Sequence, residues 1–255
     1  MQHFTWNSLK EVPEVRPEKV AALRRAIQQG TYRIDPKKLS SAVLGFDDLE
    51  LASLMSQHPG LIPEYVTLYG KNAIQDLLQI LETRDHFSGQ HCARAAAIAL
   101  KFAHYLRLSH ADLEALQTAA QLHDLGKIEI GKTILLKKKP LTAVDRAIIM
   151  SHPGMGVRIA RPFCLKPKEQ EIILHHHEQW DGQGYPDGLA GEQIPFLGRL
   201  MALADVFEAL TSDRPRRPRF PTPQALGIIQ DRAGSQFDPY LTKRFLKMLS
   251  RRKAA

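Results

Sequence analysis

The sequence predicts an all-α protein, and three features of the 255-residue chain lead to this expectation. Apolar side chains recur at the spacing of one helix face in most segments. Ser, Thr, Asp and Pro stand where these helices would begin, and Gly or Pro stands where they would end. No segment convincingly predicts a β-strand. We therefore expect a helical bundle preceded by short N-terminal helices.

The composition is typical of a soluble globular chain, with 44% hydrophobic and 24% charged residues, and is sufficient for one large or two small domains. No apolar run reaches the roughly 18–20 residues that a membrane span needs, and the N-terminus lacks the apolar region of a secretory signal. The two cysteines, Cys92 and Cys164, are too few for a disulfide framework. We expect a cytoplasmic protein without membrane association, in which Cys92 is a packed thiol pointing away from the neighbouring His91.

The charge balance favours an anionic partner or substrate, because 35 Lys and Arg residues stand against 27 Asp and Glu residues. This balance does not choose among a nucleic acid, a nucleotide and an acidic protein surface. Aromatic residues make up only 7% of the chain, and no basic patch has aromatics interleaved with it. Direct nucleic-acid binding is therefore not expected.

The first part of the chain, residues 1–60, predicts a helical segment too small to form a core by itself. Pro17 suits the first position of one helix, and Asp35 would cap a second, shorter helix. A longer helix within residues 61–86 would connect this segment to the main domain, residues 87–250.

The main domain predicts a succession of helices with recognisable ends. Ser109 and Thr142 are suitable N-caps, and Asp145 would complete a capping box with Thr142. The Gly- and Pro-rich residues 181–188 must form a loop. The expected helices cover 88–106, 109–124, 142–154, the stretch up to 161–162, 169–178 and 197–210, followed by two that open at Thr222 and Asp238.

Histidines and acidic residues at the ends of separate helices indicate a buried metal site. His123 and Asp124 stand side by side where an Ala-rich helix would end. Asp205 lies inside the apolar run RLMALADVFEAL, where an ionised carboxylate is unfavourable unless it is paired or bound to a metal. Each feature alone also fits a solvated helix end, but together they favour a metal centre; imidazole and carboxylate ligands suit Zn, Fe, Mn or Ni. The other candidates are His91, His152 and the run His175, His176 and His177.

Four motifs give a more specific signal: HDLGK (123–127), HPGMG (152–156), HHEQWDGQGYPDG (176–188) and ADVFEALTSDRP (204–215). In this order they resemble the HD-GYP family, a branch of the HD metal-dependent phosphohydrolases whose members hydrolyse cyclic di-GMP. The resemblance covers about residues 80–245. It implies an HD-type helical bundle with a central binuclear metal site. It also implies a phosphodiesterase that yields pGpG and, on further cleavage, GMP.

This resemblance implies seven metal ligands, with Asp124 bridging two ions. His175 lies one position outside the matched motif and is not expected to be a ligand. Some family members bind a third metal through a glutamate at the position of Phe87, which cannot ligate, so we expect two divalent ions. The resemblance favours iron or manganese, whereas the ligand types alone also allow Ni, Zn or Mg. The expected ligands are His91, His123, Asp124, His152, His176, His177 and Asp205.

The resemblance also implies how the site would act. A hydroxide bridging the two ions would attack the phosphodiester phosphorus in line, with Asp124 and Lys127 as catalytic residues. Lys127 would also contact the substrate phosphate, and Tyr185 would shape the guanine-side pocket. Arg214 and Arg217 would bind the second phosphate or the guanine.

Two positions depart from the family's pattern. Arg216 stands where an aromatic residue is usual, and Pro218 stands where a basic residue is usual, so the resemblance does not extend to every substrate contact. Lys127 also fits an ordinary cation near a helix end, and the arginines also fit a solvated basic loop.

The N-terminal stretch EKVAALRRAIQQGTYRIDPKKLSSAVL resembles the C-terminal half of flagellar anti-sigma factors. In that family two such helices bind the flagellar sigma factor and keep it from RNA polymerase. The resemblance implies a flagellar sigma factor as a partner of residues 16–44. The alternative is a helical extension that packs on the main domain.

Three other functions stay open beside cyclic di-GMP hydrolysis. The chain could hydrolyse another cyclic nucleotide, or bind cyclic di-GMP as a non-catalytic sensor that signals through a partner. It could also act as a sigma-factor-binding regulatory protein. The last role is compatible with catalysis and would couple a second messenger to flagellar gene expression.

Overall fold

The computed structural model describes residues 78, 81–82, 88–137, 139–160, 163, 165–214 and 217–250. All of them belong to one compact unit, His58–Ala255. The expected N-terminal segment, including residues 16–44, lies outside the described residues, as do Phe87, Cys164, Arg216 and nearly all of the expected connecting helix. The predicted domain boundaries near residues 60 and 86 therefore stay predictions.

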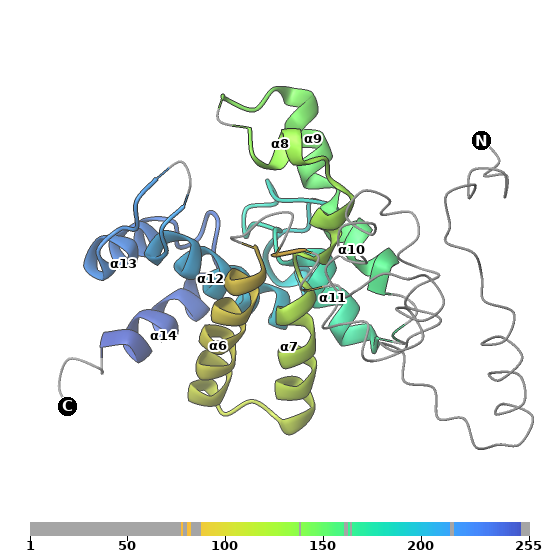
Figure 1. Cartoon of the computed structure of the whole chain (residues 1–255). Helices are drawn as coiled ribbons and strands as arrows, with labels where there is room; N and C mark the ends of the chain where they lie inside the picture. Colours follow the sequence, from red (N-terminus) through yellow and green to blue (C-terminus); the bar gives the residue numbers. More distant parts are fainter. Residues whose placement is uncertain are drawn as a thin grey trace, which may run out of the picture. The chain divides into compact units, whose positions relative to one another are not determined.

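The described residues form α-helices and short 3-10 helices, which confirms the all-α prediction (Figure 1). Among them no strand occurs, and only isolated β-bridges join loop segments. None of these helices combines the length and the apolar character needed to cross a membrane. In chain order the elements are α6 (Ser88–Leu106), α7 (His110–Leu122), η4 (Leu125–Glu129), α8 (Lys132–Leu135), α9 (Ala143–Met150), α10 (His152–Ala160), α11 (Pro167–His175), η6 (Gly191–Gln193), α12 (Phe196–Thr211), α13 (Thr222–Asp231) and α14 (Pro239–Ser250).

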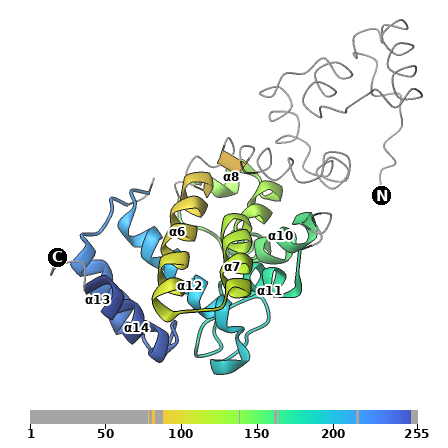
Figure 2. The same ribbon diagram turned by 90° about the horizontal axis from the view of Figure 1, so that it is seen from below.

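The core lies where α6 packs against α7 and α12, with α11 against α7 (Figure 1, Figure 2). The buried face of α6 consists largely of alanines, whose small side chains let the neighbouring helices approach closely. Phe102 of α6 and Phe207 of α12 both pack edge-on against Phe245 of α14, with ring centroids 5.0 and 5.5 Å apart respectively. These ring contacts join the C-terminal helix to the core.

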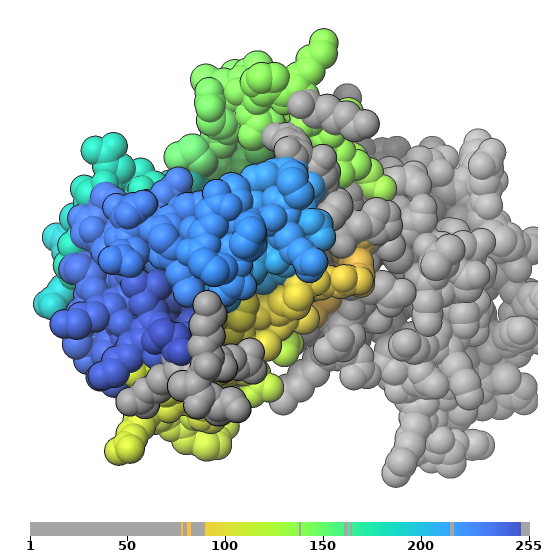
Figure 3. Space-filling model, turned by 90° about the vertical axis from the view of Figure 1, so that its left-hand side faces the viewer, coloured from red at the N-terminus to blue at the C-terminus, as the bar shows by residue number. Residues whose placement is uncertain are grey.

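The periphery of the bundle consists of the C-terminal helices α13 and α14 and of a projecting segment that contains α8 and α9. Figure 3 shows the C-terminal helices α13 and α14 forming one face of the described part of the chain. The segment with α8 and α9 projects beyond the bundle in Figure 1 and Figure 3. Its exposed apolar side chains are Leu136, Val144 and Met150.

Two predicted helix starts are confirmed by their capping contacts. The Ser109 hydroxyl accepts a hydrogen bond from the backbone N–H of Asp112 at the start of α7. Thr142 and Asp145 form the expected capping box at the start of α9. Residues of this type satisfy backbone N–H groups that a helix start leaves without intrahelical partners.

The expected helix end at 152–154 is wrong. Helix α9 ends at Met150, and His152 instead begins α10. Pro153 explains the difference, because proline lacks a backbone N–H and therefore suits the first turn of a helix as well as a position just after a helix end. His152 is therefore presented from a helix start.

The expected helix over 169–178 is displaced by a few residues. Helix α11 begins at Pro167 and ends at His175, so His176 and His177 follow it in a turn. A glutamate at the third helical position, Glu169, completes a cap with the backbone N–H of Lys166. The turn after α11, and not the helix itself, therefore carries these two histidines.

Gly126 in η4 permits a backbone contact that positions His152. A Cβ at Gly126 would lie 1.9 Å from the carbonyl oxygen of His152 and 2.6 Å from the backbone nitrogen of Gly156. Both are backbone atoms, so the clash cannot be relieved by a side-chain rotation.

We expect Gly126→Ala to lower the free energy of unfolding by about 3 kcal/mol or more, measured by thermal and urea unfolding.

The matched control is Gly131→Ala, five positions later. A Cβ there would lie 3.6 Å from the hydroxyl of Thr133, which is an ordinary contact. Gly131 also has φ −59 and ψ 136, which alanine adopts without strain. Equal unfolding midpoints for the two variants would contradict the importance of the Gly126 contact.

Candidate metal centre

The structure brings the seven expected ligands together from five helices or helix ends. They form two donor groups, in each of which one nitrogen or oxygen per residue lies within 4.8 Å of the others. All seven are buried except His177, which is partly exposed. We define group A as His91, His123 and Asp205, and group B as Asp124, His152, His176 and His177.

Group A joins α6, the end of α7 and α12. The Nε2 atom of His91 lies 2.7 Å from Oδ1 of Asp205. The Nε2 atom of His123 lies 3.7 Å from the same oxygen. Two imidazoles and a carboxylate thus converge on one point, which is a donor set typical of a first-row transition metal.

Asp124 links the two groups through its two carboxylate oxygens. Its Oδ1 atom lies 3.3 Å from Nε2 of His152, which itself lies 3.4 Å from Nε2 of His176 in group B. Its Oδ2 atom instead lies 3.9 Å from Nε2 of His91 and 3.7 Å from Nε2 of His123. This is the geometry that a carboxylate needs to bridge two ions.

Three imidazoles are oriented by the same local device. His123, His152 and His176 each follow the end of a helix and place Nδ1 2.7–2.8 Å from the carbonyl oxygen three residues earlier. A helix end leaves such carbonyls without intrahelical partners, so the Nδ1–H groups satisfy them. Nε2 of each ring is then left to face the centre, where it is available to a metal ion.

A test of fit supports a metal at group A. The Nε2 atom of His123 is buried and has no hydrogen-bond partner among the described residues. A buried polar nitrogen without a partner is unfavourable, and a metal ion would satisfy it. The residues present therefore fit a bound cation.

The electrostatics of groups A and B differ. Burial would lower the pKa of His91 and His123 in group A. Asp205 and Glu208 beside His91 nevertheless raise its pKa, and Cys92 and Asp124 raise that of His123.

Burial alone would raise the pKa of the Asp124 and Asp205 carboxyls. Lys127 and His123 hold the pKa of Asp124 well below its usual range, and His123 and His91 do the same for Asp205. Burial lowers the pKa of His176, and lowers the pKa of His177 to about 3. At neutral pH these two carboxyls are ionised and these two imidazoles are neutral, as metal ligation requires.

Glu208 is a functional residue that the sequence reasoning missed. Its buried carboxylate accepts a hydrogen bond from Nδ1 of His91, which leaves Nε2 of that ring for a metal. Arg94 and the Ser212 hydroxyl each donate to Glu208 at 2.5 Å. The available signal was its position three residues after Asp205, on the same face of α12.

Lys127 and Tyr185 lie at the centre, as expected. The Nζ atom of Lys127 lies 2.6 Å from Oδ2 of Asp124, on the group A side of that carboxylate. The ring of Tyr185 packs on the imidazole of His177, with centroids 4.8 Å apart, and approaches His152. Both side chains are partly exposed, so both can meet a substrate.

The two arginines have different surroundings. A terminal nitrogen of Arg214 lies 3.1 Å from Nδ1 of His91 and 3.4 Å from Glu208, close to group A. Arg217 donates instead to the carbonyl oxygens of Ala209 and Pro218, at 2.7 and 2.8 Å. The Arg217 guanidinium therefore hydrogen-bonds to backbone carbonyls near the end of α12 in this structure. Its role toward the substrate stays a prediction.

The Gly- and Pro-rich loop is held by a second carboxylate that sequence reasoning did not single out. Buried Glu178 accepts hydrogen bonds from the backbone N–H groups of Asp187, Gly188 and Leu189, at 2.8–3.1 Å. His175 contacts the same loop, with Nε2 2.9 Å from an oxygen of Asp187. Groups A and B do not include His175.

Cys92 is a packed thiol, as expected, because its side chain is buried. Its sulfur lies within 4.8 Å of donor atoms of His123 and Asp124, in a cluster that does not include His91. Consecutive helical residues are separated by about 100° around the axis, so His91 and Cys92 face different neighbours. Sequence spacing could not show that the end of α7 lies beside the thiol.

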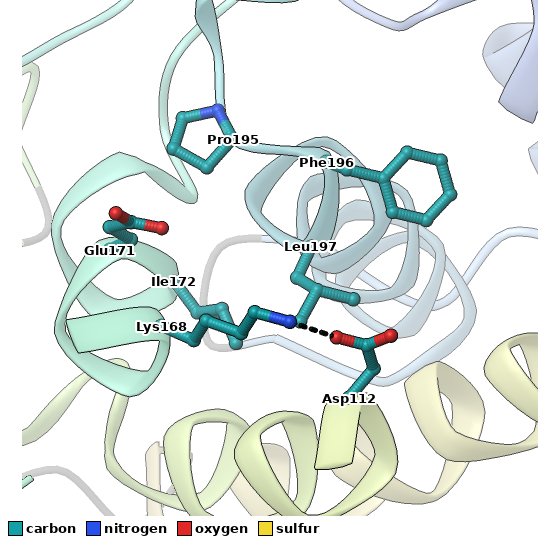
Figure 4. Close-up of a pocket in the computed structure, with 7 residues that line it drawn as sticks. All are labelled: Asp112, Lys168, Glu171, Ile172, Pro195, Phe196 and Leu197. Atoms are coloured by element: carbon teal, nitrogen blue, oxygen red, sulfur yellow. Dashed lines mark hydrogen bonds and ion pairs between the residues drawn. The ribbon is translucent and has the colours of Figure 1, made fainter. Parts of the chain in front are cut away.

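A separate pocket of about 270 Å³ lies between α7, α11 and the start of α12 (Figure 4). Lys168 and Asp112 form an ion pair of 2.6 Å across it. None of its residues belongs to group A or group B, so this pocket is distinct from the metal centre. The lining residues are Asp112, Lys168, Glu171, Ile172, Pro195, Phe196 and Leu197.

Removing the charge of Glu208 should weaken metal binding at group A. Glu208→Gln keeps the shape but loses the carboxylate that fixes the His91 ring. We expect a loss of about 10- to 100-fold in metal affinity, measured by chelator competition. Glu171→Gln, on the exposed face of α11, should leave the affinity unchanged. Equal affinities for both variants would refute the role of Glu208.

Two curated proteins of Vibrio cholerae serotype O1 are similar to this chain. A cyclic di-GMP phosphodiesterase is 38% identical over 192 residues, which cover 68% of this chain and 38% of that protein. A 3'3'-cGAMP-specific phosphodiesterase 2 is 32% identical over 208 residues, which cover 78% of this chain and 40% of that protein. The chain spans about two fifths of the length of these relatives.

A solved structure shares the fold. Bd1817, an HDG"Y"P protein from Bdellovibrio bacteriovorus, superposes with a TM-score of 0.55 at 17% identity. The match covers 92% of this chain and 80% of that chain.

The N-terminal resemblance is confirmed by a match to the family described as anti-sigma-28 factor, FlgM, over residues 5–44. This match begins earlier than the expected residue 16. The similarity to cyclic di-GMP phosphodiesterases confirms the resemblance of the main domain to HD-GYP proteins. The model of the HD domain family matches residues 76–241, which is more than half of the chain. The chain therefore belongs to the HD domain family.

Proposed function

We propose that this protein is a metal-dependent phosphodiesterase that hydrolyses cyclic di-GMP to pGpG and, by a second cleavage, to GMP. The observation that carries the proposal is the position of Asp124 between groups A and B, with one oxygen toward each. A carboxylate shared in this way can hold two cations at the short separation at which both act on one phosphodiester. Similarity to cyclic-dinucleotide phosphodiesterases supports the substrate class.

Groups A and B would each hold one divalent ion, iron or manganese, shared through Asp124. Two such ions supply an activated water and neutralise charge that develops on the phosphate. The imidazoles arrive with Nε2 already oriented by backbone carbonyls, so little reorganisation is needed on binding. The cytoplasm, where cyclic dinucleotides signal, is the proposed location.

The chain's own cations would act on the substrate beside the ions. Lys127 lies next to Asp124 and can donate a hydrogen bond to a phosphate oxygen as negative charge grows there. Arg214 lies near group A, where it can contact the second phosphate or a guanine. Tyr185 beside His177 offers a ring face on the group B side, where a guanine can pack.

The substrate assignment has one competitor within the same class. One similar protein is named for cyclic di-GMP and another for 3'3'-cGAMP, which differ in a single base. A non-catalytic cyclic di-GMP sensor is the other alternative. The complete set of donor groups favours catalysis over sensing.

Two variants separate metal binding from catalysis. Asp124→Ala removes the ligand shared by both groups, so turnover should be abolished and metal content should fall. Lys127→Ala removes a cation but no metal ligand, so metal content should be retained while kcat falls by about 10²–10³-fold. Product formation is measured by chromatography with cyclic di-GMP and 3'3'-cGAMP, and metal content by elemental analysis.

The control for Lys127→Ala is Lys132→Ala, at an exposed position of α8. Its activity should equal that of the unmodified chain. Wild-type activity in Asp124→Ala would overturn the assignment, and metal loss in Lys127→Ala would refute the proposed role of Lys127. Tight cyclic di-GMP binding without any turnover would favour the sensor.

We also propose that residues 16–44 bind a flagellar sigma factor and couple second-messenger level to flagellar gene expression. The match of residues 5–44 to anti-sigma-28 factors supports this partner. Purified flagellar sigma factor should capture the full chain but not a chain shortened to begin at residue 50. Equal capture of both chains would remove the proposal and favour an extension that packs on the main domain.

A further inference from the structure

The run of residues 175–178 contains two side chains that the proposed metal centre does not use. Its middle members, His176 and His177, belong to group B. Its outer members, His175 and Glu178, are in neither group, yet both contact the Gly- and Pro-rich loop 181–189. This loop carries Tyr185, whose ring packs on the imidazole of His177. The run therefore connects two expected metal ligands directly to the loop.

Glu178 makes the stronger of the two contacts. Its side chain is buried, and its carboxylate oxygens accept hydrogen bonds from the backbone N–H groups of Asp187, Gly188 and Leu189 at 2.8, 3.1 and 3.1 Å. Successive N–H groups that point at one anion form a concave anion site, and a hydrogen bond to an ionised acceptor is about twice as strong as a neutral one. The end of the loop is therefore fixed to Glu178.

The beginning of the loop lies against the same turn. The backbone N–H of Tyr185 donates a hydrogen bond to the carbonyl oxygen of His177 at 3.3 Å. A Cβ at Gly184 would lie 2.4 Å from Cα of Glu178 and 2.3 Å from the backbone nitrogen of Gln179, so a side chain there would exclude this approach. Tyr185 thus lies between two attachments, the backbone of the turn before it and the carboxylate of Glu178 after it.

His175 makes a weaker attachment at Asp187. Its Nε2 atom lies 2.9 Å from Oδ2 of Asp187, whose side chain is 53% exposed to solvent. A polar contact that is exposed to this extent contributes little to stability. His175 should therefore restrain the loop much less than Glu178 does.

We propose that Glu178 is a positioning residue for substrate binding, which holds the loop 181–189 so that the ring of Tyr185 lies where a base of the cyclic dinucleotide packs. Glu178 is 3% exposed and belongs to neither donor group, so it acts through the loop rather than by touching the substrate. His175 is a secondary anchor of the same loop. The inference rests on the proposed function, because it concerns how the same site binds its substrate.

A loosened loop should weaken substrate binding more than it slows the chemical step. A base stacked on an aromatic ring contributes about 5- to 150-fold in affinity. The expected metal ligands and Lys127 do not depend on the loop for their positions. Loss of an interaction that is equally strong in the ground state and the transition state raises KM and leaves kcat unchanged.

The test compares variants of the full chain by steady-state kinetics with cyclic di-GMP, by elemental analysis and by hydrogen–deuterium exchange. Glu178→Gln retains one of the two oxygen acceptors, and Glu178→Ala retains neither. We expect KM to rise by about 10-fold in Glu178→Gln and further in Glu178→Ala, while kcat changes by less than about threefold. The amides of residues 187–189 should exchange faster in the same order, and metal content should stay unchanged. In His175→Ala KM should rise by less than about threefold.

A double-mutant cycle separates positioning from general stabilisation. Tyr185→Ala removes the ring that Glu178 is proposed to place, so adding Glu178→Gln to Tyr185→Ala should raise KM little further. Independent structural roles would instead make the two effects add. Glu192→Gln is the matched control, because Glu192 is an exposed glutamate in η6, just after the loop. Its KM and its amide exchange should equal those of the unmodified chain.

The possible results are distinguishable. An unchanged KM in Glu178→Gln, or additive effects in the cycle, would overturn the positioning role and leave the proposed function intact. Loss of metal from Glu178→Gln would also overturn it, because the residue would then act through the adjacent His177. If the unmodified chain hydrolysed neither cyclic di-GMP nor 3'3'-cGAMP, the proposed function and this inference would both fail. Should Glu178→Ala not fold, the isosteric Glu178→Gln still decides the test.

Discussion

The buried carboxylate of Asp124 is the constraint on which the rest of this structure depends. An ionised carboxylate in a helical core is strongly unfavourable unless cations or hydrogen-bond donors surround it. Here Lys127 and imidazoles from several helices face its two oxygens. The helix ends that carry these groups can therefore not move independently, because each group stabilises the same buried carboxylate.

Helix termini provide the positional accuracy of the centre. A histidine at the end of a helix can donate to a carbonyl that the helix leaves unpaired and still direct its other nitrogen outward. The structure uses this arrangement at His123, His152 and His176. The same hydrogen bonds thus stabilise the helix ends and orient the donors. Gly126 allows the segment after α7 to come into backbone contact with His152 at the start of α10.

A layer of acidic and basic residues surrounds the donor groups and fixes them. Glu208 orients His91 and is itself held by Arg94 and Ser212. Glu178 gathers three backbone N–H groups of the loop that carries Tyr185. These carboxylates contribute no donor to group A or group B, yet both determine where groups that face the substrate can lie.

The sequence by itself determined the all-α class, several helix starts and the types of residue at the centre. These features are local: periodicity, caps and motifs act over a few residues, so they can be recognised without the fold. His123–Asp124 and Asp205 were recognisable because a polar group beside apolar residues requires a partner. The assignment of His152 to a helix end was wrong because Pro153 is compatible both with a helix stop and with the first turn of a helix. In the structure α10 begins at His152 and packs against η4.

Only the tertiary structure decided which side chains from distant segments meet. It placed Cys92 against His123, joined Glu208 to His91, and directed Arg217 to the end of α12. Each outcome depends on the rotation and separation of packed helices. A change in side-chain volume of even one methylene group can alter these, and no local pattern encodes them. The sequence thus determined which donor types are present. Their convergence on one centre depends on the packing of the Ala-rich face of α6 against α7 and α12.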